Sequence, residues 1–220
     1  MPFALSFWQM TMNVFWDWNG TLCDDVFTAL QAVNAILAKR DRQPIDLDAY
    51  YSYMDTPIYK FYEHLFDLQK EPMSVLGAEF YANYDKFLRK DCLMQGAYQT
   101  LTMLKEAGVR QFLLSSSHCD QIMPTVSRLG LLPFFEKVLA ADDWNVASKS
   151  ERARQFCVSN GLRGEETWFV GDLLHDWDAA KLCGAHCLLI PHGHQSEQDL
   201  KNAGDCFCPS VTEVPKRLGL

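Results

Sequence analysis

The chain has 220 residues, of which 48% are hydrophobic and 22% charged, a composition typical of a globular protein rather than a disordered one. This length suits one domain, or a main domain with an insertion, and is sufficient to bury a hydrophobic core. The formal net charge of −8, with no cluster of Lys and Arg and no apolar run of bilayer-spanning length, argues against nucleic-acid and membrane partners.

Eight cysteines are scattered through mostly apolar segments without a repeated Cys-x-x-Cys spacing. We therefore expect reduced thiols that pack in the core of a cytoplasmic protein, rather than a zinc site. Cys206 and Cys208 alternate as residues of a strand do, and Cys183 and Cys187 have helical spacing.

The first predicted element is an apolar strand over 12–16, and the residues before it are expected to form a loose extension without the features of a signal peptide. Asp17 follows the strand directly, and a Gly20-Thr21 turn comes next. A carboxylate in this position is held rigidly at the carboxyl edge of a sheet, where open α/β folds bind ligands. Asp17 is therefore a candidate nucleophile or metal ligand, although the strand alone slightly favours an aspartate that caps the turn.

Residues 24–92 contain no convincing strand, but helix-like segments such as 26–40 and 76–89 that are rich in Phe, Tyr and Leu. A segment of this length is too long for one crossover connection between parallel strands. The pattern predicts a helical cap domain over 24–92, inserted into a core domain formed by residues 1–23 and 93–220. The aromatic side chains of the cap are expected to serve packing rather than ligand contact.

After the predicted cap, short apolar segments of strand character alternate with amphipathic segments of helical character. Gly108, Gly130 and Gly161 follow three of the latter, where C-cap glycines are expected. The alternation predicts an α/β fold with a doubly wound parallel sheet. The strands are predicted over 110–114, 137–140, 167–170 and 186–190, and the helices over 97–107, 120–129 and 149–160.

Four residues with reactive side chains lie near the ends of the predicted strands. Asp17, Ser115 and Asp172 follow the first, second and fourth strands, and Lys149 begins the helix after the third. Because the carboxyl ends of parallel strands meet at one edge of a sheet, we expect these side chains to lie close together. Two carboxylates, a hydroxyl and an ammonium group suit a phosphate site with Mg²⁺, which prefers oxygen ligands.

These segments resemble the motifs of the haloacid dehalogenase superfamily of phosphohydrolases. Residues 17–22 (DWNGTL) are similar to its first motif, 113–115 (LLS) to the second, Lys149 to the third, and 171–176 (GDLLHD) to the acidic fourth. The motifs are specific jointly and cover nearly the whole chain. A cap inserted after the first motif is similar to that of phosphoglycolate phosphatase and β-phosphoglucomutase relatives. The resemblance implies a magnesium-dependent phosphomonoesterase that acts on a small phosphorylated metabolite.

The resemblance also implies roles for residues that match the motifs. Asp17 would attack phosphorus to form an aspartyl-phosphate that water later cleaves, and Lys149 would tie it to the phosphoryl group. Magnesium would be bound by Asp17, the main-chain carbonyl of Asn19 and Asp172, while Asp176 would orient a water on the metal. The implied catalytic set is Asp17, Asn19, Ser115 and Lys149.

Substrate contacts are expected from donors near these motifs and from the cap. Ser115 and backbone N–H groups near residues 19–20 and 116 would bind the transferring oxygens. The segment 53–60 of the cap is the candidate region for specificity, and its Lys60 suits a second anionic group, although a surface lysine explains the same sequence. The candidate substrate-binding residues are Gly20, Thr21, Ser116, Asp55 and Lys60.

The first motif departs from the superfamily at one position that matters for the chemistry. Its phosphatases carry a second aspartate two residues after the nucleophile, which protonates the leaving group and then activates water, and here that residue is Asn19. An amide does not shuttle a proton, so a contribution of ~10²–10⁴ in rate is expected to be missing. Acyl and aryl phosphates, whose leaving groups need little protonation, should suffer least.

Three interpretations of Asn19 stay open. In the first, the chain is a phosphatase with a replacement acid, for which Asp55, His118 and His175 are candidates that are also explained as capping or packing residues. In the second, it is a catalytically impaired phosphate-binding or regulatory protein. In the third, it performs other chemistry, such as phosphonate hydrolysis through Lys60, which ranks below phosphate hydrolysis because those enzymes carry alanine in the position of Asn19.

The loop after the last predicted strand contains His192 and His194. Without a third ligand in the sequence nearby, we interpret this pair as polar loop residues rather than a metal site. The predicted partner is a small phosphorylated metabolite, and the predicted assembly is a monomer or a homodimer.

Overall fold

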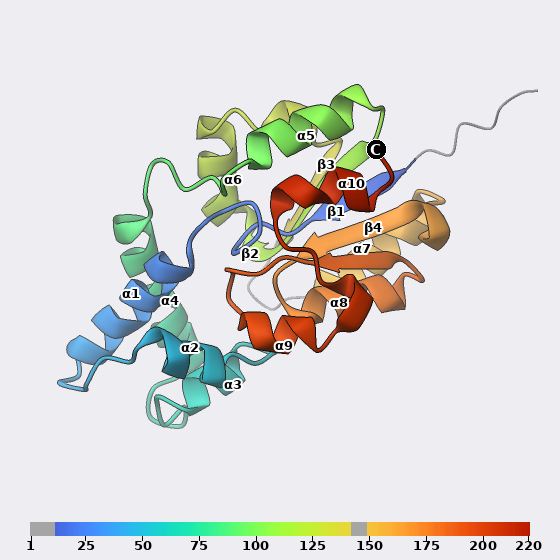
Figure 1. The fold of residues 1–220 in the computed structure, drawn as a ribbon. Helices are drawn as coiled ribbons and strands as arrows, with labels where there is room; N and C mark the ends of the chain where they lie inside the picture. Colours follow the sequence, from blue (N-terminus) through green and yellow to red (C-terminus); the bar gives the residue numbers. More distant parts are fainter. Residues whose placement is uncertain (1–11, 142–148) are drawn as a thin grey trace, which may run out of the picture.

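A computed structural model of the protein describes residues 12–141 and 149–220, and the predicted extension before Met12 lies outside these ranges. A five-stranded parallel sheet lies between layers of helices, and a further group of helices extends to one side (Figure 1). The strand order is β3-β2-β1-β4-β5, which confirms the doubly wound α/β prediction. The strands are β1 (Asn13–Trp16), β2 (Arg110–His118), β3 (Lys137–Ala141), β4 (Thr167–Gly171) and β5 (His186–Leu189).

The central strand β1 contributes side chains to a hydrophobic layer on each face of the sheet. Val14 and Trp16 pack with α5 (Ala97–Glu106), α6 (Cys119–Arg128) and α10 (Val214–Arg217). Phe15 faces α7 (Lys149–Ser159) and α8 (Leu174–Leu182) and stacks between Phe112 and Phe169, at centroid distances of 4.9 and 4.8 Å. Burial on both faces fixes the strand, and therefore the position of Asp17 directly after it.

Helices α1 (Val26–Ala38), α2 (Leu47–Tyr53), α3 (Tyr59–Glu63) and α4 (Met73–Phe87) form the group beside the sheet (Figure 1). They bury a hydrophobic cluster of their own, which includes Ile36, Phe61 and Leu76. The chain enters and leaves this group at adjacent points, because the Asp24 amide donates to the Cys92 carbonyl over 2.7 Å. We call residues 24–92 the cap, and this division of the chain stays a prediction that the pairing supports.

Most predicted elements are present with shifted ends, and two expectations for cysteines are wrong. Residues 204–206 form a 3₁₀ turn, and Phe207 makes an isolated bridge to Leu189 rather than belonging to a strand. Cys183 ends α8 whereas Cys187 lies on β5, because the turn at Gly184 separates the two elements. All eight cysteines are free. Helix α9 (Glu197–Lys201) completes the core, and no helix in the described ranges could span a membrane.

Candidate active site

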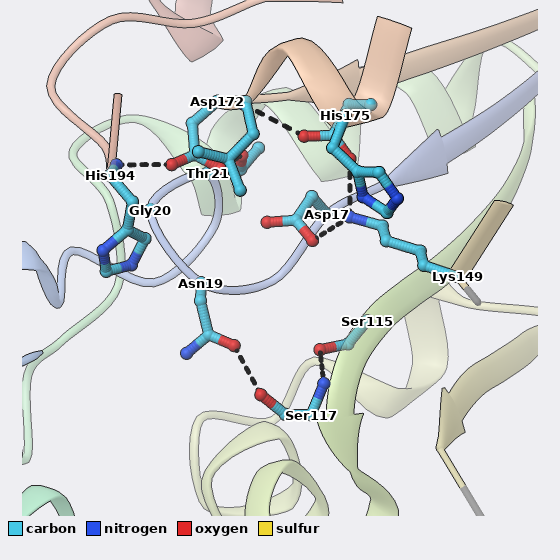
Figure 2. A network of polar contacts seen from close by, with 12 residues as sticks. Asp17, Asn19, Gly20, Thr21, Ser115, Ser117, Lys149, Asp172, His175 and His194 are labelled. Carbon is cyan, nitrogen blue, oxygen red and sulfur yellow. Dashed lines mark hydrogen bonds and ion pairs between the residues drawn. The ribbon is translucent and has the colours of Figure 1, made fainter. Parts of the chain in front are cut away.

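Asp17 lies where β1 gives way to a tight loop at the carboxyl edge of the sheet (Figure 2). Its amide still follows the sheet pattern and donates to the Val170 carbonyl over 2.8 Å. The loop then folds back, and the Trp18 carbonyl accepts hydrogen bonds from three following amides. Gly20 has φ +75°, and a Cβ there would lie 2.2 Å from Oδ2 of Asp172, so both backbone and packing require glycine.

Lys149 joins Asp17 to a second carboxylate in the interior. Its Nζ donates to Oδ1 of Asp17 and, over 2.5 Å, to Oδ1 of Asp176, and all three side chains are buried. Burial raises the pKa of Asp17 well above its usual range, Lys149 opposes the shift, and the charges of Asp176 and Asp172 add to it. Burial would lower the pKa of Lys149, but the two carboxylates outweigh it and raise the pKa, so the ammonium stays charged.

Asp172 follows β4 and is fully buried on the opposite side of Asp17 from Lys149 (Figure 2). Its Oδ2 accepts from the backbone amide of His194 over 2.5 Å, and its Oδ1 accepts from the Thr21 hydroxyl over 3.3 Å. Burial raises the pKa of Asp172 to about 6, opposed by His194 and assisted by Asp176. Gly193 permits the close approach of the His194 loop, since a Cβ at Gly193 would lie 2.1 Å from the carboxylate.

Asn19 is held by a buried polar network that the sequence analysis did not find. Its amide donates to Oδ2 of Asp25 over 2.7 Å, and its side-chain oxygen accepts from the Ser117 hydroxyl over 2.9 Å. Asp25 also accepts from the Tyr84 hydroxyl over 2.5 Å and lies 3.2 Å from Nε2 of His194. Tyr50 completes the network at 2.9 Å from the other ring nitrogen of His194.

The charges of Asp25 and His194 stabilise each other. Burial would raise the pKa of Asp25, but His194, Tyr84 and Asn19 outweigh it and hold the pKa below its usual range. Burial would lower the pKa of His194, but Asp25 outweighs it and raises that pKa to about 9. The interpretation of His194 as a polar loop residue is therefore wrong, because its ring is buried against the site.

The second motif also lies at this edge. Ser115 is buried within β2, where the register with β3 shifts after Leu114, and its Oγ accepts from the Ser117 amide over 3.1 Å (Figure 2). Ser116 is exposed and lines the cavity described below. The backbone amide of Gly20, expected to contact substrate, instead donates to Oδ1 of Asp25 over 2.7 Å and to the Cys23 carbonyl over 2.9 Å. The turn therefore uses this donor internally.

The structure gives no support to the prediction that Asp55 and Lys60 bind substrate, because neither lines the cavity described below. Their side chains pair with each other over 3.1 Å, about half exposed, beside a shallow depression of their own on the cap. Of the three candidate replacement acids, His118 lines the cavity next to Asn19, whereas Asp55 and His175 do not. His175 instead lies 3.4 Å from the Ser150 hydroxyl, and burial lowers its pKa.

A cavity of about 910 Å³ lies between the core and the cap, with Asn19 and Asp25 at its floor. Its upper wall consists mainly of apolar and aromatic side chains from α1 to α4. The volume is near the upper end of the range of ~300–1,000 Å³ that is usual for small-molecule sites. A ligand that fills the cavity reaches the loop that follows Asp17.

The donor set beside Asp17 suits a hard divalent cation. Four buried carboxylates, those of Asp17, Asp25, Asp172 and Asp176, face two buried cationic groups, Lys149 and His194. In the described ranges no three His, Cys, Asp or Glu side chains converge as a ready metal site. The ligand set expected from the sequence, Asp17, Asp172 and the Asn19 carbonyl, therefore stays a prediction; oxygen groups of this kind are those that Mg²⁺ takes together with water.

Comparison with known proteins agrees with this arrangement. Residues 14–190 match the family described as haloacid dehalogenase-like hydrolase. The chain belongs to this family. This hydrolase is 24% identical over 211 residues to a phosphoglycolate phosphatase of Nitrosospira multiformis, covering 91% of this chain and 92% of that protein. The family and enzyme class inferred from the sequence are therefore confirmed.

Solved structures share the fold of this hydrolase. A haloacid dehalogenase-like family protein from Streptococcus pneumoniae superposes with a TM-score of 0.81 at 17% identity, covering 95% of this chain and 99% of that one. A predicted phosphatase from Clostridium acetobutylicum superposes with a TM-score of 0.80 at 23% identity, covering 96% and 99%. At these identities the superpositions establish the shared fold alone.

Proposed function

We propose that this hydrolase is a magnesium-dependent phosphomonoesterase in which Asp17 takes the phosphoryl group from substrate and water then cleaves the aspartyl-phosphate. The observation that carries the proposal is the pairing of Asp17 with Lys149 at the carboxyl edge of the sheet, with Asp172 on its other side. The names of the relatives, phosphoglycolate phosphatases above all, support a small phosphorylated substrate.

In this proposal Lys149 orients the nucleophile and neutralises part of the charge that develops on the transferring oxygens. Asp176 holds Lys149 in place, with its second oxygen occupied by the Leu173 amide at 3.1 Å. Ser115 lies at the same edge and supplies a hydroxyl donor to the phosphoryl group. Bound by Asp17, the Asn19 carbonyl and Asp172, magnesium would reduce the repulsion between the carboxylates and an incoming phosphate.

The leaving group receives no proton from Asn19, whose amide hydrogens are directed to Asp25 and Tyr84. Good leaving groups should therefore react fastest. His118, at the cavity wall, is the replacement acid we retain from the three candidates. Phosphonate hydrolysis through Lys60 has no support, because Lys60 lies outside the cavity and pairs with Asp55.

The test uses purified protein with Mg²⁺ and either acetyl phosphate or p-nitrophenyl phosphate. We expect turnover that EDTA stops and added Mg²⁺ restores, and acid quenching during turnover should trap a phosphoryl group on the peptide that contains Asp17. Asp17→Asn should abolish both. Phosphate binding without turnover across a broad panel of esters would support the impaired-protein alternative instead.

A further inference from the structure

The wall of the cavity is mainly apolar and aromatic, whereas phosphoglycolate, the substrate in the names of the relatives, carries a carboxylate. We propose that the preferred substrate is the phosphate monoester of an uncharged, largely apolar alcohol, in particular an aryl alcohol. This inference rests on the phosphatase activity proposed above. It disfavours esters that carry a carboxylate in addition to the phosphate, as phosphoglycolate does. The observations that support this are the side chains of one helix face, the location of the cationic groups of the cap, and the size of the cavity.

Helix α4 provides one wall through residues spaced three or four apart, which share a face. These include Met73, Gly77, Phe80, Tyr81 and Tyr84. Phe61 and Met54 extend the same apolar surface from the neighbouring segments of the cap. An aromatic or alkyl leaving group would bury its surface here, at about 25 cal/mol per Å² of apolar area.

Several cationic side chains of the cap pair with carboxylates away from the cavity. Among the described residues that line the cavity there is no Lys or Arg. Lys60 pairs with Asp55, Arg40 pairs with Glu71 and, over 2.7 Å, with Glu79, and Arg89 pairs with Asp24.

The acidic side chain among the described residues that line the cavity is Asp25. A substrate carboxylate would enter a mainly apolar space whose described lining offers no Lys or Arg as a partner, and a buried charge without a partner is costly. Two imidazoles also line the cavity, those of His118 and His194, and the His194 ring is already paired with Asp25.

The size of the cavity points the same way. At ~30 Å³ per water, 910 Å³ corresponds to roughly thirty water molecules, so a two-carbon ester would leave most of the space hydrated. A ring system that replaces this water against Phe80 and Tyr81 gains apolar contact without leaving a polar group unpaired.

Gly77 offers a direct test, because a Cβ at this position would meet no atom within 4 Å and the residue lies within α4. Gly77→Leu adds a side chain on the cavity face, starting from a Cβ that meets no neighbour, and has better helix propensity than glycine. Ala82→Leu is the matched control, since Ala82 is exposed on the same helix and does not line the cavity.

The experiment compares kcat/KM for acetyl phosphate, phenyl phosphate, 2-naphthyl phosphate, 4-carboxyphenyl phosphate and 2-phosphoglycolate. We expect phenyl phosphate to exceed 4-carboxyphenyl phosphate by about tenfold, equivalent to ~1.4 kcal/mol, although the carboxylate does not make the leaving group poorer. Gly77→Leu should lower the ratio of kcat/KM for 2-naphthyl phosphate to that for acetyl phosphate by about tenfold. Gly77→Arg should reduce the difference in kcat/KM between phenyl phosphate and 4-carboxyphenyl phosphate. Ala82→Leu should change none of these ratios.

Faster turnover of phosphoglycolate or 4-carboxyphenyl phosphate than of the uncharged aryl esters would overturn the inference while leaving the phosphatase proposal intact. If no ester is hydrolysed, the phosphatase proposal fails, and the inference is decided by calorimetry with non-hydrolysable ligands. Tighter binding of benzylphosphonate than of phosphonoacetate then supports an apolar site, and the reverse order contradicts it.

Discussion

Asn19 donates its side-chain amide to Asp25 over 2.7 Å, so the residue in place of the expected acid is bound to a second, buried carboxylate. A carboxylate at position 19 would face Asp25 without the intervening hydrogen. The amide is thus matched to its surroundings, because Asp25 on one side requires a donor and Ser117 on the other supplies one.

Asn19→Asp should raise kcat for alkyl phosphates at mildly acidic pH and should lower the stability of the protein at higher pH. Two facing carboxyl groups share a proton only at low pH, so the pKa of one is raised in the folded state and stability falls as pH rises. The loss of a charged hydrogen bond costs roughly 1.5–3 kcal/mol. Urea denaturation at pH 5.5 and 8 measures the stability, and Asn83→Asp on the cap is the control. An unchanged alkyl phosphate rate at pH 5.5 would mean that another group already serves as the acid.

The metal-free protein should lose stability between pH 6.5 and about 9 because of His194. Its pKa is raised on folding, so its contribution is complete below the unfolded pKa and disappears as pH rises through the folded one. The total is about 3 kcal/mol at ~1.4 kcal/mol per pKa unit. Urea denaturation across this range should show a flatter profile for His194→Gln. His186→Gln, at an exposed histidine, should keep the wild-type slope.

Lys149→Met should be destabilising as well as inactivating. The substitution leaves Asp17 and Asp176 buried without their cation, and breaking a buried ion pair costs roughly 3–5 kcal/mol. Thermal denaturation should show a smaller loss at pH 5, where the carboxyls take up protons, than at pH 8. We expect kcat/KM to fall by at least about 10²–10³. Lys216→Met, at a side chain that is 83% exposed, should leave stability and activity unchanged.

Lys60→Ala should leave kcat/KM within about twofold of the wild type for every ester tested, because surface pairs of this kind contribute little. Its side chain is 40% exposed, and its ammonium is paired with Asp55, outside the cavity. Steady-state kinetics check this prediction. A large rise in KM for phosphoglycolate alone would show that Lys60 turns toward the substrate after all.

The sequence was sufficient to place Asp17, Asp172 and Lys149 at one edge of the sheet, because the positions of these residues follow from the order of the strands. Parallel strands of fixed direction bring their carboxyl ends together, so the residue after each buried segment is placed without knowledge of packing. The apolar run over 12–16 likewise located β1, which fixes the position of Asp17.

Asp25, Tyr84 and His194 were missed because their contacts join distant segments with no periodic pattern. Asp25 and His194 are 169 positions apart, and the pair forms only once Gly193 lets its loop approach Asp172. The prediction that Lys60 contacts substrate lacks support for a local reason. Neighbouring residues of a short helix point in different directions, and in α3 Phe61 faces the cavity while Lys60 faces outward.

Helix α4 carries both the apolar wall and the Tyr84 hydroxyl that binds Asp25. The wall extends along most of the helix, whereas the hydroxyl that binds Asp25 lies near its carboxyl end, so substitutions should differ in effect along the helix. Substitutions at residues 73, 77 and 80 should change which ligand fits the cavity without altering the contacts of Asp25. A substitution at residue 84 should alter both the cavity wall and the hydrogen bond to Asp25. Evolution of substrate preference is therefore expected to proceed through replacements in the first part of this one helix.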